Sequence, residues 1–404
     1  MSASKSAADL ESFRRRLREW LRENIAPASD ADADSELTEE RVAAMRDVQR
    51  RLYAAGYAGF TFPKAVGGQG LTLDHDSVFL QEAARYQVPS QLFGVSINIL
   101  GATLAEFGTD EQKAAHVPRI LSGEEIWLQL LSEPGGGSDL AGLLTSARRD
   151  GDTYVVNGQK TWSSLGHLAD YGLCPVRTRW DVPKHAGISV LIVPLNAPGV
   201  EVRRITKITG DTEFAEVFLT DVSVPVENRV GEENEGWRVL KGLLEIEHAW
   251  VGRVGGRGDL ADVFDRLRSF ADARGLTKDP VTRHRLTELF VAVSAQKALA
   301  RRVSQGTATG TLPAGYGSLL KLGDSPLRQR LAETGLAMGG TEAVAWLPGS
   351  PTAGLTRAYL ESRSATIAGG TTEIQRNNVA ERVLGLPKEP TLFANAPFTD
   401  IPHN

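Results

Sequence analysis

Hydrophobic residues recur with a helical period through roughly the first 125 positions of the chain. Phe13, Leu17 and Leu21 are spaced four residues apart within residues 8–25, which predicts an amphipathic helix with one apolar face. The arginines around them are expected to form its solvated face. Two further helices are predicted, over residues 37–55 and 74–86.

The pattern then changes to short β-strands separated by turns. Asp150-Gly151 and Asn157-Gly158 are typical hairpin-turn dipeptides, and Thr153–Val156 between them is predicted to be a strand. Three more strands are predicted at Gly187–Val193, Val200–Arg204 and Glu216–Leu219. Strands and helices do not alternate in this block, which argues against a Rossmann unit and predicts a small β domain with hairpin connections.

Helical periodicity returns after the β block. Several helix boundaries, both before and after this block, carry capping residues. Thr109 and Gln112 have the spacing of a capping box for a helix that ends at Gly123. Asp279-Pro280 and Ser325-Pro326 each predict an N-cap followed by a proline at the first helical position.

The sequence therefore predicts an α+β protein with helical, β and helical parts in that order. The expected parts are an N-terminal α-helical domain (1–125), a middle β-barrel or sheet domain (126–232), a C-terminal α-helical domain (233–390) and an unstructured tail (391–404). A chain of 404 residues with 41% hydrophobic content is long enough for several domain cores.

Composition and charge exclude several classes of function. The net charge of −5 predicts no basic surface for nucleic acid or for an acidic membrane. No apolar run is long enough to cross a bilayer and no signal-peptide core is present, so the protein is expected to be soluble and cytoplasmic. The single cysteine, Cys174, is expected to be a buried thiol. The histidines lack metal-ligand spacing, and the Gly-x-Ser-x-Gly motif of hydrolases is absent.

Three stretches carry residues suited to a planar, anionic ligand, although each alone is also consistent with an ordinary loop, core aromatic or helix cap. Ser132–Asp139 holds three consecutive glycines, which leave backbone N–H groups open to an anion. Trp162–Ser164 places a flat ring beside two hydroxyls. In Ile367–Asn377, two glycines precede two threonines that can cap the next helix, and Thr372 has capping-box spacing with Gln375.

The chain resembles the acyl-CoA dehydrogenase family of flavoproteins over nearly its whole length. The resemblance rests on five motifs, which are specific in this order and spacing although each is weak alone. They are Ser132-Glu-Pro-Gly-Gly-Gly-Ser-Asp139, Val156-Asn-Gly-Gln-Lys-Thr-Trp162, Phe218-Leu-Thr-Asp-Val-Ser-Val-Pro225, Gly236-Trp237 and Gly370-Thr-Thr-Glu-Ile-Gln-Arg376. The match looks closest to actinobacterial members that act on steroid side-chain CoA thioesters.

This resemblance implies a C-terminal four-helix bundle, with FAD bound between the β domain and that bundle. It also implies α,β-dehydrogenation of an acyl-CoA thioester and electron delivery to an electron-transfer flavoprotein. By motif match, the residues expected at the flavin are Gln129, Leu131, Ser132, Gly137, Ser138, Trp162, Ser163, Ser164 and Thr371. Ser138 and Gly370 are also expected to bind the substrate.

The implied reaction needs a carboxylate base to remove the α-proton. In most members of the family this glutamate directly precedes the Gly-Thr of the C-terminal motif, a position that is Gly369 here. A minority of members carry the glutamate on the helix after the Gly-Trp motif, where this chain has Glu245 and Glu247.

Helical phase favours Glu247. It lies seven residues from both Leu240 and Val254, on the predicted apolar stripe, whereas Glu245 lies on the polar face. Burial is expected to raise the pKa of the Glu247 carboxyl toward the range of a general base. The alternative is a structural ion pair with an arginine. His248 replaces an arginine common in the family and is either a partner of base or substrate or a surface residue beside Glu245.

Gly369 can still take part in the implied catalysis. Its backbone N–H can polarise the thioester carbonyl as an oxyanion-type donor. Because glycine leaves space beside the α-carbon of the substrate, a bulky or α-branched acyl group is expected.

Two motifs that complete FAD sites across subunit interfaces in the family's homotetramers are missing. The Arg-x-x-Phe-Gly region reads Ala273–Pro280, and the Gln-x-x-Gly-Gly region reads Leu336–Gly340, with leucine in place of glutamine. We therefore expect an α2β2 complex with a related subunit that supplies these residues. The alternatives are a non-catalytic structural subunit of such a complex, or an acyl-CoA oxidase or flavin monooxygenase on the same fold.

Overall fold

The computed structural model describes residues 2–28, 37–254, 259–347, 349–388, 390 and 393–402. The chain divides into two compact units. Unit 1 comprises Met1–Ile205, Thr212–Trp250 and Phe393–Asn404, and unit 2 comprises Thr206–Asp211 and Val251–Leu392.

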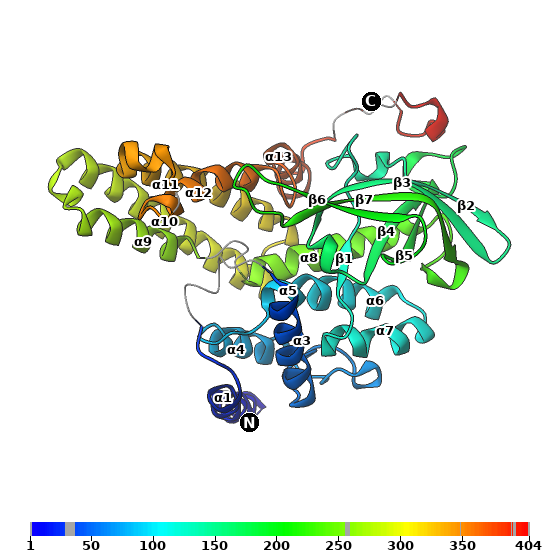
Figure 1. Ribbon diagram of the computed structural model, residues 1–404, viewed down its shortest axis with the longest axis horizontal. Helices are drawn as coiled ribbons and strands as arrows, with labels where there is room; N and C mark the ends of the chain where they lie inside the picture. The colour runs from blue at the N-terminus through cyan, green and yellow to red at the C-terminus, as the bar shows by residue number, and fades with distance from the viewer. Residues whose placement is uncertain are drawn as a thin grey trace. The chain divides into compact units, whose positions relative to one another are not determined.

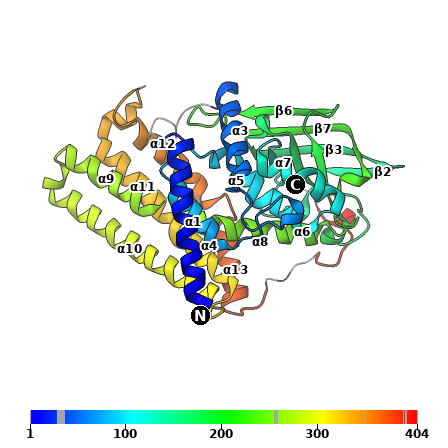
Figure 2. The same ribbon diagram turned by 90° about the horizontal axis from the view of Figure 1, so that it is seen from below.

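Unit 1 begins with a helical part, as predicted. Its helices are α1 (Ser2–Asn24), α3 (Glu39–Ala54), α4 (Leu73–Ala83), α5 (Ser90–Val95), α6 (Ala102–Phe107) and α7 (Asp110–Ser122), with a π-helical segment at Ser96–Gly101. Phe13, Leu17 and Leu21 are buried in one core cluster with Val78 of α4, which confirms the apolar face of α1. Figure 2 shows α1 and α4 side by side.

The start of α7 carries the predicted capping box. The hydroxyl of Thr109 accepts the backbone N–H of Gln112, and the side-chain oxygen of Gln112 accepts the backbone N–H of Thr109. Gly123, with a φ of 77°, ends the helix. The Gln112 amide also donates to the carbonyls of Glu227 and Arg229, so this cap anchors the helix to the β part as well.

The middle part of unit 1 is one eight-stranded sheet (Figure 1). Its strands are β1 (Trp127–Gln129), β2 (Ser146–Asp150), β3 (Thr153–Ser164), β4 (Tyr171–Arg177), β5 (Ile188–Pro194), β6 (Val200–Ile205), β7 (Phe214–Pro225) and β8 (Arg229–Val230). The order is β6-β7-β3-β2-β4-β5-β8, and β1 pairs in parallel with β4. The hairpin predicted at Asp150-Gly151 joins β2 to β3, with Gly151 at a φ of 60°.

Asn157-Gly158, in contrast, is not a turn. β3 runs through it, and the dipeptide marks a shift of register in the pairing of β3 with β7. The Asn157 amide donates to the Asp221 carboxylate and accepts the Asp221 backbone N–H, which fixes the two strands together. A Cβ on Gly158 would lie 2.5 Å from the Thr145 hydroxyl, so the glycine serves a close approach between chain segments.

The last described α-helix of unit 1 packs against this sheet. It is the part of α8 (Gly236–Val254) that ends at Trp250. Val239, Leu240 and Leu243 are buried in the same core cluster as Trp127 of β1 and Val190 of β5. Packing of these residues against the sheet fixes the rotation of α8 about its axis and so the direction in which its polar residues point.

Unit 2 is helical and confirms the predicted C-terminal helical part. Its helices are α9 (Leu260–Ala273), α10 (Pro280–Ala308), α11 (Gly317–Ala345), α12 (Ala353–Ser362) and α13 (Thr372–Asn378). Figure 2 shows α9, α10 and α11 running alongside one another, and they share one apolar core. The Asp279 carboxylate caps α10 by accepting the Thr282 backbone N–H, as its sequence predicts.

The helix start predicted at Ser325-Pro326 is wrong. Both residues lie inside α11, and the buried Ser325 hydroxyl donates to the Ala365 carbonyl at 2.8 Å. A tertiary partner, rather than a free helix end, therefore satisfies this serine. The same helix changes direction at Gly340, whose φ of 60° and ψ of −147° are not helical.

Residues 393–402 do not behave as the unstructured tail that the sequence predicts. Their Phe398 side chain is buried in unit 1, and a short 3-10 helix spans Phe398–Asp400. Within the described ranges, none of the helices combines the length and apolar character that a membrane span requires.

Candidate active site

Glu247 and Gln129 meet within unit 1. The Gln129 side-chain amide, at the end of β1, donates to Glu247 Oε2 at 2.9 Å. Glu245 and His248 on the same helix are exposed. The orientation expected from helical phase is therefore observed, but Glu247 is half-buried rather than fully buried. Its partner is a neutral amide, not the arginine of the alternative interpretation.

The glycine-rich loop that follows β1 is anchored at its root by Glu133. Its carboxylate accepts the backbone N–H groups of Leu144 and Thr145 and pairs with the Lys160 ammonium at 2.8 Å. The Lys160 and Glu133 side chains are 0% and 9% exposed. Burial alone would raise the pKa of Glu133, but Lys160 and these hydrogen bonds outweigh burial and lower that pKa.

The tip of the same loop is open. Gly135, Gly137 and Ser138 are exposed, while Ser132 is half-buried below them. A Cβ on Gly137 would come within 3.3 Å of the Ser132 hydroxyl, so a larger residue would crowd the space above that serine. A rigid root with an exposed, glycine-rich tip is suited to a ligand that approaches the backbone closely.

Trp162 is the unusual residue of β3. It is 59% exposed, has a left-handed φ of 60° and lies edge-on to Phe214 at 5.8 Å. Ser163 beside it is buried, and its hydroxyl has no hydrogen-bond partner among the described residues, while Ser164 is exposed. Strained backbone and unsatisfied polar groups concentrate at functional sites. The sequence motif identified these residues but could not reveal the strain or the unpaired hydroxyl.

In unit 2, the Gly369-Gly370 turn leads into α13 through Thr371. The glycines have φ values of 68° and 87°. Thr371, not Thr372, is the N-cap, and its hydroxyl accepts a backbone N–H of the first turn. Gln375 does not complete a capping box but donates to the Gly369 carbonyl at 3.0 Å. Thr371 therefore caps α13, and the capping box predicted between Thr372 and Gln375 is wrong.

Lys321 is a neighbour of this turn that the sequence did not single out. Its ammonium donates to the Ala368 carbonyl at 2.7 Å and lies 3.9 Å from where a Cβ on Gly369 would stand. Among the described residues, apart from the two that adjoin Gly369 in the chain, no other heavy atom comes within 4 Å of that Cβ position. The position that carries the base in most of the resembled family is therefore open space beside a cation.

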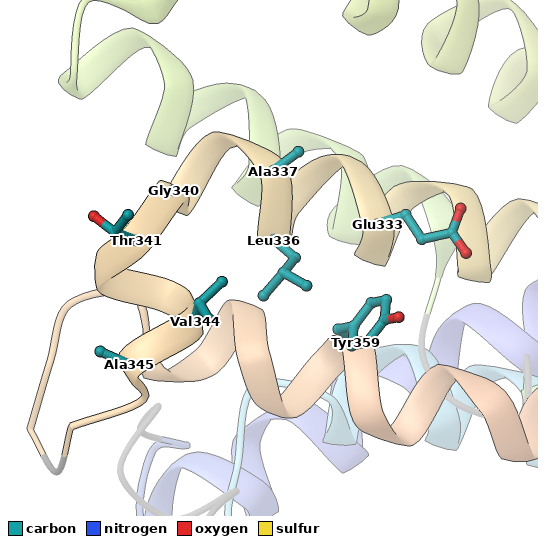
Figure 3. Close-up of a pocket in the computed structure, with 8 residues that line it drawn as sticks. All are labelled: Glu333, Leu336, Ala337, Gly340, Thr341, Val344, Ala345 and Tyr359. Carbon is teal, nitrogen blue, oxygen red and sulfur yellow. The ribbon is translucent and has the colours of Figure 1, made fainter.

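A cavity of about 600 Å³ lies between α11 and α12 of unit 2. Figure 3 shows the side chains of Leu336, Val344 and Tyr359 directed into the same space. Leu336 occupies the position where a glutamine was expected by motif. Most of the residues that line the cavity are apolar, so a leucine matches this surface better than a glutamine would.

Family models and relatives agree with this architecture. Models of the acyl-CoA dehydrogenase N-terminal, middle and C-terminal domains match residues 7–124, 129–222 and 234–384. The acyl-CoA dehydrogenase IpdE1 of Mycobacterium tuberculosis is 37% identical over 388 residues, which cover 94% of this chain and 99% of that relative.

Solved structures give the same result. The Tcur3481-Tcur3483 steroid ACAD superposes with a TM-score of 0.79 at 30% identity, covering 95% of this chain and 98% of that one. The ChsE4-ChsE5 complex from Mycobacterium tuberculosis gives a TM-score of 0.72 at 30% identity, with coverage of 94% and 98%. From its motifs, its helical–sheet–helical fold and these matches, the chain belongs to the acyl-CoA dehydrogenase family of oxidoreductases.

Proposed function

We propose that this chain is the catalytic subunit of a heteromeric, FAD-dependent acyl-CoA dehydrogenase whose substrate is a bulky, steroid side-chain-like thioester. The contact between Gln129 and Glu247 carries the proposal, because it holds a carboxylate on α8 where the alternative base of the family is expected. The steroid ACAD and the two-component ChsE4-ChsE5 complex among its structural neighbours support the substrate class and the heteromer.

The residues of unit 1 fit a flavin. An exposed indole beside the unpaired Ser163 hydroxyl suits a planar ring with polar edges, and the open loop tip suits a phosphate. The residues of unit 1 proposed to hold FAD are Gln129, Leu131, Ser132, Gly137, Ser138, Trp162, Ser163 and Ser164. By motif match alone, Thr371 is also proposed as a cofactor-binding residue. When bound, FAD supplies the acceptor for the β-hydride, and an electron-transfer flavoprotein is the proposed oxidant of the reduced enzyme.

Glu247 is proposed to remove the α-proton of the acyl-CoA. Gln129 holds Oε2, which leaves Oε1 to receive the proton. The Gly369 backbone N–H is proposed to donate to the thioester carbonyl, so that the charge that develops on its oxygen is stabilised as the proton leaves. Ser138, Gly370 and the exposed His248 are proposed substrate-binding residues.

The test is Glu247→Gln, with Glu245→Gln on the exposed face of the same helix as its control. The first variant is expected to keep its bound flavin but to lose bleaching of the flavin absorbance by acyl-CoA under anaerobic conditions. The second is expected to be reduced at the normal rate. Normal reduction of the Glu247→Gln protein would place the base elsewhere.

The heteromer has its own test. Leu336 and the apolar cavity around it leave unit 2 without the glutamine that a homotetramer would contribute to a neighbouring site. The chain is therefore expected to bind flavin fully only when it is produced with a related subunit. Mass measurement and flavin content of the protein made alone and with that partner decide the question, and a flavin-loaded, active homomer would contradict it.

The oxidase alternative has a separate test. Peroxide release under air during turnover of an acyl-CoA would indicate an oxidase and not a dehydrogenase.

A further inference from the structure

Arg177, at the end of β4, is a buried guanidinium held by backbone carbonyls. It is 0% exposed, and among the described residues no carboxylate hydrogen-bonds to it. Its two terminal nitrogens donate to the carbonyls of Lys184 at 2.6 Å, Ala141 at 2.6 Å and Leu143 at 3.3 Å. Its Nε has no partner within the described ranges. A buried cation with only neutral partners is costly and needs further support.

That support comes from the C-terminal segment. The Arg177 guanidinium carbon lies 3.7 Å from the centre of the Phe398 ring, whose negative face attracts a desolvated cation. The segment is fixed by two backbone hydrogen bonds, from Phe398 to the Val182 carbonyl and from Thr399 to the Trp180 carbonyl. The rings of Trp180 and Phe398 also pack at 5.5 Å.

The residues that Arg177 holds lie directly after the glycine-rich loop. Ala141 and Leu143 belong to the turn that follows Asp139, and the Asp139 carboxylate accepts both a 2.7 Å and a 2.8 Å hydrogen bond from Lys184. Lys184 in turn is the residue whose carbonyl Arg177 binds. The far end of the loop is thus held by Arg177 and Lys184, as its root is held by Glu133 and Lys160.

Electrostatics agree with this geometry. Burial lowers the pKa of Arg177 to about 10, against the opposing effect of Glu133 and Asp139. Removal of the ring would open the guanidinium to water, which competes with the carbonyls of the turn for the same N–H groups.

We propose that Phe393–Pro402 is a strap, and that Phe398 is a positioning residue that fixes the turn behind the glycine-rich loop through Arg177. The expected effect on ligand binding rests on the proposed function of Ser132 and Ser138. The expected effect on the order of the loop is independent of that function.

The experiment compares Phe398→Ala and Phe398→Leu with Phe393→Ala, an exposed phenylalanine of the same segment, in the full-length holoenzyme. Hydrogen exchange of residues 135–143 is measured together with kcat and KM. We expect exchange to become about tenfold faster in Phe398→Ala and to remain normal in Phe393→Ala. Phe398→Leu keeps an apolar side chain without an aromatic face, so it should fold and show an intermediate increase in exchange.

The kinetic arm separates positioning from a general loss of structure. KM for acyl-CoA should rise several-fold in Phe398→Ala while kcat stays near normal, and Phe398→Leu should restore part of the loss. Normal exchange of residues 135–143 in both Phe398 variants would overturn the strap. Faster exchange with normal KM and normal flavin content would support the strap and count against the proposed ligand role of the loop.

Discussion

The side-chain amide of Gln129 donates to the carboxylate of Glu247 at 2.9 Å and so joins the end of β1 to α8. An amide is a suitable partner for a base, because it fixes the carboxylate by donating a hydrogen bond without supplying a charge or a transferable proton. Residues of β1 and α8 pack in the same core, and this packing determines where the proposed base points.

Replacement of Gln129 by leucine should impair catalysis without loss of the base itself. Hydrogen bonds to charged groups contribute about 1.5–3 kcal/mol, so we expect flavin reduction by substrate to slow by about tenfold or more. Rapid-mixing absorbance measures this rate, and bound flavin measured before mixing shows whether the cofactor site is intact. A Gln129→Leu enzyme that is reduced at the normal rate would show that Glu247 needs no such orientation.

The buried pair of Lys160 and Glu133 should dominate the stability of the loop root. Lys160→Met leaves an unpaired carboxylate with only 9% of its side chain exposed, and we expect a loss of about 3–5 kcal/mol in the free energy of unfolding. Lys184→Met breaks the more exposed pair with Asp139 and should cost about 1 kcal/mol or less. Denaturant unfolding of the two variants compares them directly, and equal losses would contradict the assignment.

The same pair predicts a dependence of stability on pH. The folded pKa of Glu133 is lowered, so its contribution is present above its ordinary pKa and is lost as the pH falls through the folded value. The free energy of unfolding should therefore decrease on acidification more steeply in the wild-type protein than in Glu133→Gln. A comparison of the two unfolding curves across the acid range tests this, and parallel curves would refute it.

Features set by neighbouring residues could be predicted from the sequence. The apolar face of α1, the capping box of α7 and the orientation of Glu247 on α8 follow from spacing along a helix, and the structure shows all three. Asn157-Gly158 and Ser325-Pro326 were misassigned because distant residues, Asp221 and Ala365, satisfy their polar groups. Local rules contain no information on such partners.

The candidate site likewise combines features that the sequence predicts with features that only the fold reveals. Sequence motifs pointed to Trp162 and Ser163, but only the fold shows the left-handed backbone and the unpaired hydroxyl, which lie at a register shift between β3 and β7. Phe398 and Arg177 lie far apart in sequence and share no motif, so only the fold reveals their contact. Glu247 is less buried than its position on the stripe suggested, because periodicity gives a direction but not a depth.

Cys174 should be inert in the folded protein. It is fully buried, as its apolar surroundings predict, and burial raises the pKa of the thiol to about 11. An alkylating reagent near neutral pH should modify it only at the rate at which the protein unfolds, and mass spectrometry follows the reaction. In denaturant, where the thiol is exposed, the same reagent should modify Cys174 rapidly. Rapid modification of the native protein would contradict the burial found here.

The proposed bulky substrate can be tested at Gly369. Among the described residues beyond its chain neighbours, a Cβ there would meet Lys321 alone, but the left-handed φ of 68° makes alanine unfavourable by about 1–2 kcal/mol. Gly385 is a matched control in the same unit, with a φ of 67° and, apart from its chain neighbours, no described residue within 4 Å of its Cβ position. Both alanine variants should therefore lose similar stability, as thermal unfolding would show.

Only Gly369→Ala should change substrate preference. If an α-branch occupies the open space, one added methyl group should lower kcat/KM for an α-methyl-branched acyl-CoA relative to its unbranched analogue by about tenfold or more. Gly385→Ala should leave that ratio unchanged. Equal losses on both substrates in Gly369→Ala would mean that the space beside Lys321 does not receive the acyl chain, and the glycine would then serve only the geometry of the turn that Thr371 caps.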